Sequence, residues 1–505
     1  MRRLLCAALF LLTAPLAGQT AAPVSRAAAT ITSADVARRV GVIADDSMMG
    51  RDTPSRGLDL TARYVAEEFR KFGLRPGGDS SYLQFYPITR RRLDPEKSRV
   101  VFTVGEVRQT AGFTTSARHD GGAVPEKAVR AGAVLVGGAQ TAESAGRIEL
   151  AEKVVLYSPP ARVDQNTLHQ VVRVLFLAQP KALLILSDKD SATFARAIPK
   201  RAPERTVVGL PTRQPVVVQV RAGAVSHALA AAGVDLTEVR AATVPVFKPL
   251  DRLTVEVDLK DTTISSLKAP NTVGILEGSD PVLKNQHIVY SAHMDHIGIT
   301  PGKPDSINNG ADDDASGTTG VIELAEAFSR PGARPKRSII FLTVSGEEKG
   351  LWGSDHFASH PPVPIGQIVA NINIDMIGRN WPDTIVAIGK EHSDLGATLN
   401  RVNAAHPELR MTAIDDRWPE ERFYFRSDHY NFARKGVPVL FFFNGVHEDY
   451  HEVTDSPDRI NSEKEARILR LLYYLGQEIG NSPNRPTWNP ESRREIVEEK
   501  GVSRR

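Results

Sequence analysis

The sequence predicts an α/β protein with a mixed, mostly parallel sheet covered by helices and with an inserted β-rich domain. Three observations predict this fold. From about residue 251, apolar strand patterns alternate with helical patterns, which is typical of a parallel sheet covered by helices. Between residues 91 and 250, Glu and Lys become scarce, and short Val, Leu and Ile strands are separated by Pro, Gly and Ala. A length of 505 residues is enough for two or three domains.

The N-terminal residues 1–21 have the features of a secretory signal peptide. Arg2-Arg3 precede an apolar run from Leu4 to about Leu16, and small residues follow. The alternative, a transmembrane anchor, is disfavoured because this run is too short to span a bilayer. The single cysteine of the chain, Cys6, lies in the same segment, so the mature protein would have no disulfide and no thiol chemistry. We therefore expect a secreted or periplasmic bacterial protein without a stable membrane anchor.

The rest of the chain divides into four parts. Residues 22–90 are expected to be the N-terminal part of the main domain, with helices between 33 and 78 and with Ser33 as the first N-cap. Residues 91–250 are the expected inserted domain, and 251–485 the main part of the larger domain. In that main part we expect strands at 253–259, 271–276, 287–292, 337–345, 367–375, 384–389 and 437–445, and helices at 320–330 and 463–480. Residues 486–505 are polar, and we expect a loosely held tail.

The charge of the chain argues against two classes of partner. The formal net charge is +3, which is small for 505 residues. A nucleic acid or an anionic membrane would favour a much more basic protein. We therefore expect neither as a partner.

Acidic and histidine side chains follow several of the expected strands. In open α/β sheets, ligands bind beyond the carboxyl ends of the strands, so these side chains are expected to meet at one edge. In chain order they are His293, Asp295, His296, Asp312, Asp313, Asp314, Glu347, Glu348, Asp375, His447, Glu448, Asp449 and His451, and Tyr450 directly precedes the last of them.

Each of these features has a simpler explanation when it is taken alone. A histidine at a strand end is usually structural, and the aspartates could cap a helix. Asp375 is harder to explain, because it ends an apolar run and a buried acid needs a partner. Together, imidazoles and carboxylates without thiols predict a site for hard or borderline divalent cations, two of which would balance the negative charge. The adjacent Glu347 and Glu348 are then compatible, because one can bind a cation while the other acts as a base.

These motifs resemble the zinc-dependent aminopeptidase family, which includes bacterial leucyl aminopeptidases, aminopeptidase Y, glutamate carboxypeptidase II and the transferrin receptor. The resemblance covers roughly residues 33–90 and 250–480 and implies the co-catalytic zinc exopeptidase fold. The segment near 125–240 resembles the protease-associated domain that many of these enzymes carry as an insertion. The motifs that carry the family resemblance are His293-x-Asp295, GADDDASG at 310–317, Glu347-Glu348, Asp375-Met376 and Tyr450-His451.

The resemblance implies a role for each matching residue at a site with two zinc ions. His293 and Asp375 would hold one zinc, Glu348 and His451 the other. Asp313 would bridge them, with Asp312 as the alternative. The resemblance also implies that Asp295 orients His293 and that Glu347 is the general base. Tyr450 would donate a hydrogen bond to the developing oxyanion. Many relatives have Asn where this chain has Asp314. The segment with Ser427, Asp428 and His429 resembles a family segment near the substrate pocket. The alternative is that its hydrogen bonds only order a loop.

The resemblance also implies the reaction. It points to an aminopeptidase that releases N-terminal residues from peptide or protein substrates by attack of a metal-bridging hydroxide. A carboxypeptidase on the same fold would need a cation for the terminal carboxylate, and Arg379 and Arg426 are candidates. A non-catalytic, receptor-like binding protein is disfavoured, because all five ligands and the base are present. A two-metal phosphoesterase is disfavoured, because the motifs contain no phosphate-binding Lys or Arg and no nucleophilic Ser.

Overall fold

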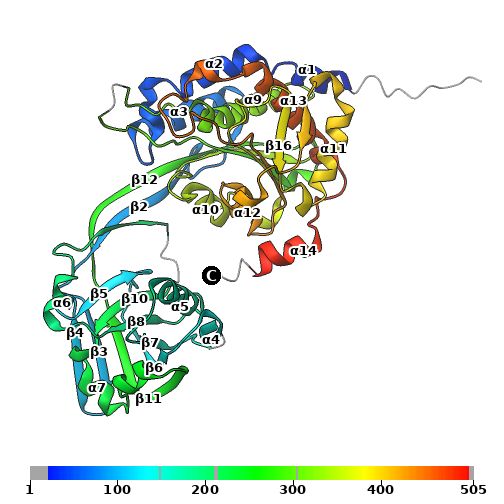
Figure 1. The fold of residues 1–505 in the computed structure, drawn as a ribbon. Helices are drawn as coiled ribbons and strands as arrows, with labels where there is room; N and C mark the ends of the chain where they lie inside the picture. The colour runs from blue at the N-terminus through cyan, green and yellow to red at the C-terminus, as the bar shows by residue number, and fades with distance from the viewer. Residues whose placement is uncertain (1–20, 147–148, 210–213, 303–304, 500–505) are drawn as a thin grey trace, which may run out of the picture. The chain divides into compact units, whose positions relative to one another are not determined.

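The computed structural model describes residues 21–146, 149–209, 214–302 and 305–499. Residues 1–20 of the expected signal peptide therefore lie outside the described residues. The chain forms two compact units (Figure 1). The first unit contains the described residues through Tyr86 and those from Lys268 onward, and the second is Pro87–Leu267. In the described part of the chain, no helix is both long and apolar enough to cross a membrane.

The sheet of the first unit is mixed and has a parallel centre. Its strands lie in the order β17 (Thr412–Ile414), β16 (Thr384–Ile388), β18 (Val439–Phe442), β15 (Ile368–Ile374), β13 (His287–His293), β14 (Ser338–Val344) and β12 (Asp261–Leu276). Strands β18, β15, β13 and β14 are parallel neighbours. Antiparallel β16 and β12 flank them, and β1 (Arg75–Pro76) pairs antiparallel with β12. The predicted mixed, mostly parallel sheet is confirmed.

Helices cover both faces of this sheet, because its central strands are apolar on both sides. Ile288 and Tyr290 of β13 pack in one core, whereas Val289 between them packs in another. Figure 1 shows most helices of the unit on one side of the sheet and α10 and α12 on the other. The first core contains residues of α1 (Ala21–Ala28), α2 (Ser33–Ile43), α3 (Arg56–Lys71), α9 (Gly317–Ser329), α11 (Leu395–Ala405) and α13 (Ser462–Asn481), and the second contains residues of α10 (Trp352–Ser359) and α12 (His429–Ala433).

Two local expectations were wrong. The N-cap of α2 is Thr32 rather than Ser33, since the Thr32 hydroxyl accepts the backbone N–H of Asp35. Residues 486–499 are not a loose tail: α14 (Pro490–Arg493) and η11 (Arg494–Glu499) follow Trp488, whose indole N–H donates to the carbonyl of Gly436. Ile496 is only 1% exposed and packs in the second core, so one apolar side chain and one indole hold the segment. Residues 500–505 lie outside the described part.

The second unit is β-rich, as the sequence predicts. Its core lies on both faces of the sheet, which short helices cover, including α5 (Gln165–Leu177), α7 (Ser226–Ala231) and α8 (Leu236–Ala241). Separately, β9 (Glu204–Val208) pairs with residues 88–92 of β2 (Leu83–Leu93). The main sheet has the order β4 (Val107–Gly112), β3 (Arg99–Val104), β11 (Pro245–Asp258), β6 (Val129–Gly138), β7 (Val154–Ser158), β8 (Ala182–Ser187), β10 (Val216–Arg221) and β5 (Ala117–Gly121).

Candidate metal centre

The carboxyl ends of the central strands carry the candidate site. His293 is the last residue of β13, and Asp375 directly follows β15. After β14 the chain turns at Gly346, which has a φ of +73° and packs so closely that a Cβ there would lie 2.7 Å from the Tyr86 hydroxyl oxygen. This turn carries Glu347 and Glu348 toward the site, which neighbouring residues of a continuous strand would not reach together.

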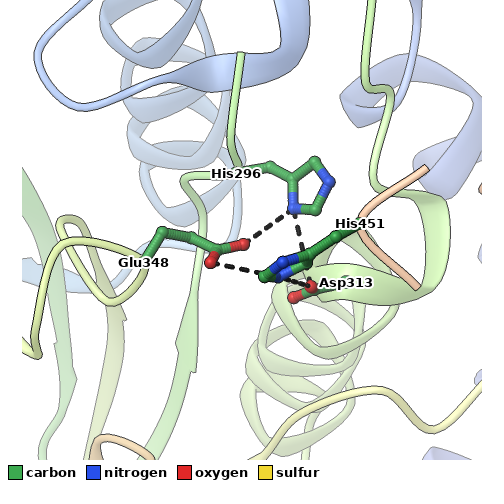
Figure 2. A group of neighbouring side chains, drawn as sticks. All are labelled: His296, Asp313, Glu348 and His451. Carbon is green, nitrogen blue, oxygen red and sulfur yellow. Dashed lines mark ion pairs between the residues drawn. The ribbon is translucent and has the colours of Figure 1, made fainter. Parts of the chain in front are cut away.

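Two groups of potential metal ligands meet at this edge and share Asp313. In the first group, shown in Figure 2, Nε2 of His451 lies 3.2 Å from both Oδ2 of Asp313 and Oε2 of Glu348. A further side chain, His296, completes this group, with Nδ1 lying 2.9 Å from Oε1 of Glu348. In the second group, Nε2 of His293 lies 3.3 Å from Oδ1 of Asp313 and 3.6 Å from Oδ1 of Asp375.

Asp313 gives one carboxylate oxygen to each group, which is the geometry of a bridging ligand. Its neighbour Asp312 points elsewhere: Oδ1 accepts the backbone N–H of Gly378, and Oδ2 lies 3.2 Å from Nε2 of His447. Asp455 holds the backbone between them, since its carboxylate accepts the N–H groups of both Asp312 and Asp313. The loop therefore turns only Asp313 toward both groups.

The residues fit divalent cations by two tests. Ligand atoms around a tetrahedral zinc with bonds of about 2.0–2.1 Å are about 3.3 Å apart, and the separations above lie close to that value. Several of these atoms are also buried without a hydrogen-bond partner among the described residues, namely Nδ1 of His296, Oδ2 of Asp313, Oε1 of Glu348 and Nε2 of His451. Buried polar atoms without partners are rare, and a shared cation would satisfy all four.

The charges of the metal-free site point in the same direction. Burial alone would lower the pKa of His451, but Asp313 and Glu348 raise it to about 10. Burial would also lower the pKa of His293. The charges of Asp314 and Asp375 outweigh this effect and raise that pKa well above its ordinary value. Without metal, protons on the imidazoles thus supply the positive charge that the carboxylates need. Cations that displace those protons would meet a preformed negative site.

Glu347 lies beside the two groups without belonging to either. It lines a pocket together with His293, Asp375 and Tyr450, and the lining also contains the apolar residues Phe423, Phe441, Phe443 and Val446. Burial, with a further contribution from Asp428, raises the pKa of Glu347 well above its ordinary value, although His293 opposes this. The ring of Tyr450 stacks on that of His451, with centroids 3.9 Å apart.

Neighbouring side chains fix the orientation of the ligands. Nδ1 of His293 lies 3.1 Å from the backbone carbonyl of Asp295, while the Asp295 carboxylate is 3.8 Å away and instead accepts from Thr53 and from the N–H of Glu347. Ser427 donates to Oδ2 of Asp375, which leaves Oδ1 facing His293. The carboxylate of Asp314 accepts hydrogen bonds from three backbone N–H groups, those of His293, Gly317 and Met376. A carboxylate can therefore order the backbone at the position where many relatives have Asn.

Two residues of this site could not be assigned a role from the sequence. His296 is one of the polar residues that follow the strands, but a histidine directly after His-x-Asp has no distinctive spacing that would indicate a role. Arg51 lies in a turn far from the motifs, is fully buried, and donates to backbone carbonyls on both sides of the site. Those carbonyls belong to Ile43, Met294, Asn309, Gly310 and Asp313. A single buried arginine in a loop leaves no periodic signal in the sequence.

Replacing Arg51 by Met should lower the free energy of unfolding by about 3 kcal/mol or more, because it leaves several buried carbonyls without donors. Chemical denaturation monitored by circular dichroism measures this change. The matched control is Arg56→Met, since Arg56 is exposed a few residues along the chain. Equal stability of the two variants would contradict the role of Arg51 in holding the site loops.

Zinc should stabilise the protein more at neutral than at acidic pH. In the metal-free protein, burial raises the pKa of Asp428 to about 7 and those of Asp295 and Asp455 to about 6. The folded chain therefore binds more protons than the unfolded chain between about pH 4 and 7, so its stability falls as the pH rises through that range. Cations offset these carboxylate charges, and the increase in Tm on adding zinc should be larger at about pH 7.5 than at about pH 5.5. Thermal unfolding with and without chelator measures it; an equal increase at both pH values would contradict the expectation.

Comparison with known proteins agrees with this geometry. Residues 271–476 match Peptidase family M28. Aminopeptidase YwaD of Bacillus subtilis (strain 168) is 26% identical over 226 residues, which cover 41% of this chain and 44% of that protein. A probable zinc metalloprotease of Pyricularia oryzae is 34% identical over 263 residues, covering 43% and 51%. The chain thus spans about half the length, or less, of these curated relatives.

Among solved structures, an aminopeptidase from Aneurinibacillus sp. strain AM-1 aligns with 92% of this chain and 98% of its own, with 18% identity and a TM-score of 0.47. The resemblance to a protease-associated domain in the second unit stays a prediction, whereas the family resemblance of the first unit is confirmed. Both ligand groups and Glu347 fall within the matched segment. Residues 271–476 of this chain are therefore a domain of peptidase family M28.

Proposed function

We propose that this chain is a two-metal peptidase that acts as an aminopeptidase. One observation carries the proposal: Asp313 places one oxygen in each of two ligand groups, beside a pocket lined by Glu347. Zinc is the first choice of metal, because the ligands are imidazoles and carboxylates. Two such cations would polarise the scissile carbonyl and lower the pKa of a bound water.

The side chains around the pocket have complementary roles in this reaction. Glu347 takes a proton from the attacking water and then delivers it to the leaving amine. This exchange needs a carboxylate that is free of the metals and faces the substrate, and Glu347 lines the pocket without belonging to either ligand group. The N–H of Glu347 is held by Asp295, which fixes the turn. Tyr450 lines the same pocket and would donate its hydroxyl hydrogen to the developing oxyanion.

The aminopeptidase direction has two supports. The curated relative from Bacillus subtilis is named an aminopeptidase. In addition, the pocket combines an acidic side with an aromatic wall, which suits a free ammonium and an apolar N-terminal side chain. We therefore expect faster cleavage after apolar than after charged N-terminal residues.

One observation favours a second candidate, a carboxypeptidase. Arg426 lines the pocket and could hold a substrate carboxylate, although it also lies 3.2 Å from Glu421. The other candidate, Arg379, is engaged by Asp449 at 2.8 Å and by Glu448 at 3.4 Å. Arg426 is thus the residue on which this second reading depends.

A panel of matched peptides distinguishes the two functions. We expect cleavage of a peptide with a free N-terminus, no cleavage of its N-acetylated form, and unchanged cleavage when the C-terminus is amidated. The opposite pattern would assign a carboxypeptidase. Chelation should abolish cleavage, and added zinc should restore it. A protein that binds no metal and cleaves neither peptide would contradict the proposal.

We further propose that the chain is exported through its N-terminal segment, and that the mature protein is secreted or periplasmic. The support is the sequence alone, with Arg2-Arg3 before a short apolar run. N-terminal sequencing of the protein recovered outside the cytoplasm of a bacterial host should give a start near residues 18–22. Recovery of the intact N-terminus in the cytoplasm would contradict export.

A further inference from the structure

His296 extends the group of Asp313, Glu348 and His451 beyond the ligands that the motifs imply. Nδ1 of His296 lies 2.9 Å from Oε1 of Glu348 and 3.6 Å from Oδ2 of Asp313. Figure 2 shows the ring of His296 beside the side chains of Asp313, Glu348 and His451. The ligand atoms of all four residues lie within 4.8 Å of one another. Four donors at such separations match the coordination shell of a tetrahedral cation.

The bonding of His296 argues against an ordinary hydrogen bond to Glu348. Both ring nitrogens of His296 and Oε1 of Glu348 are buried and have no hydrogen-bond partner among the described residues, even though Nδ1 and Oε1 are close. His296 itself is fully buried. A cation bound by Nδ1 of His296 and Oε1 of Glu348 would give both of these atoms a partner.

The backbone is built to hold this ring in place. The N–H of His296 donates to the carbonyl of Arg51, and the Arg51 side chain holds the carbonyls of Met294 and Gly310. Gly310 has a φ of +56°, and a Cβ at this position would lie 2.6 Å from Cγ and Cδ2 of His296. The imidazole therefore packs directly on the backbone next to the loop that carries Asp313.

The other ligand group is different. It contains three protein ligands, His293, Asp375 and Asp313. All three line the substrate pocket with Glu347, whereas in the first group only Asp313 and Glu348 do, and His296 and His451 do not. Structural zinc sites have four protein ligands, whereas catalytic sites have three and an open position for water or substrate.

We propose that His296 is a direct metal ligand, so that the two metals of this site are unequal. The enclosed metal has four protein ligands, His296, Asp313, Glu348 and His451, whereas the open metal has three and keeps one position for water or substrate. This inference rests on the proposed two-metal function. Two imidazoles also make the enclosed position more selective for zinc over magnesium or manganese, because nitrogen ligands favour zinc. The enclosed metal should leave slowly and the open one quickly.

The rate of zinc release to a chromogenic chelator tests this. The full chain is loaded with zinc, its content is measured by elemental analysis, and release is followed by absorbance. We expect two zinc ions per chain, released in a fast and a slow phase of equal amplitude. His293→Ala should remove the fast phase and keep the slow one.

Paired substitutions at His296 separate a ligand from a packing residue. Nδ1 of His is attached to Cγ, as are the side-chain oxygens of Asp and Asn, so these two residues place an oxygen near the position of Nδ1. His296→Asn should speed the slow phase by about 10–100-fold, and His296→Asp should restore most of the slow release. A cobalt-loaded protein gives a second readout, since loss of the imidazole should shift the visible absorption of the enclosed cobalt.

Three results would overturn the inference. They are release of both zinc ions in one phase from the unsubstituted protein, an unchanged slow phase in His296→Asn, or equal acceleration in the Asn and Asp variants. These outcomes differ from failure of the proposed function, which would appear as absence of bound metal or of peptide cleavage in the unsubstituted protein.

Discussion

Replacing Glu347 by Gln should lower kcat by about 100-fold to 10,000-fold and leave both metals bound. Gln has the shape of Glu but cannot accept a proton from the attacking water. Glu347 belongs to neither ligand group and lines the pocket, so its loss should affect turnover rather than metal content. Steady-state kinetics on a free N-terminal peptide, with elemental analysis of the same sample, measure both quantities.

The matched control is the adjacent residue. Glu348→Gln makes the same chemical change one position along the chain, but Glu348 is a member of the first ligand group. This variant should lose zinc as well as activity. Near-normal turnover in Glu347→Gln, or loss of zinc from that variant, would show that the two glutamates have been assigned the wrong roles.

Replacing Asp313 by Ala should remove both metals and reduce peptide cleavage to background. The reason is its position, since Oδ1 belongs to the group of His293 and Oδ2 to the group of His451. A single substitution therefore removes a ligand from each metal. Once the metals are lost, the repulsion between the remaining carboxylates is no longer offset by positive charge. Zinc content should fall from two per chain to well below one.

Asp312→Ala is the control for this prediction. Asp312 is buried next to Asp313, but its carboxylate accepts the N–H of Gly378 and faces His447. We expect Asp312→Ala to lower the free energy of unfolding by about 1–3 kcal/mol, through the lost buried hydrogen bonds, and to retain zinc. If Asp312→Ala lost both metals and Asp313→Ala retained them, Asp312 would be the bridging residue.

The sequence was informative where a residue type repeats or sits at a strand end. Apolar runs such as residues 287–292 and 368–374 predicted the central strands, because a strand buried on both faces must be apolar throughout. The parallel order of those strands then brought His293, Asp313, Glu348, Asp375 and His451 to one edge, as expected. Sequence alone could therefore place most of the candidate site.

Features that depend on a single distant contact could not be predicted. Arg51 acts through carbonyls that lie up to 262 positions away in the chain, and nothing in its neighbours signals this. Ile496 and Trp488 anchor a polar segment that composition alone predicts to be a tail. His296 gains its place from the packing of Gly310 against its ring. Each case is set by tertiary packing, on which local patterns carry no information.

The central claim is that Asp313 joins two cations in one site. Anomalous diffraction from crystals of the zinc-loaded protein, recorded on both sides of the zinc absorption edge, tests it most directly. The account predicts two zinc peaks about 3.5–4 Å apart, each beside one oxygen of Asp313. A single peak, or two peaks of which one lies away from Asp313, would contradict it.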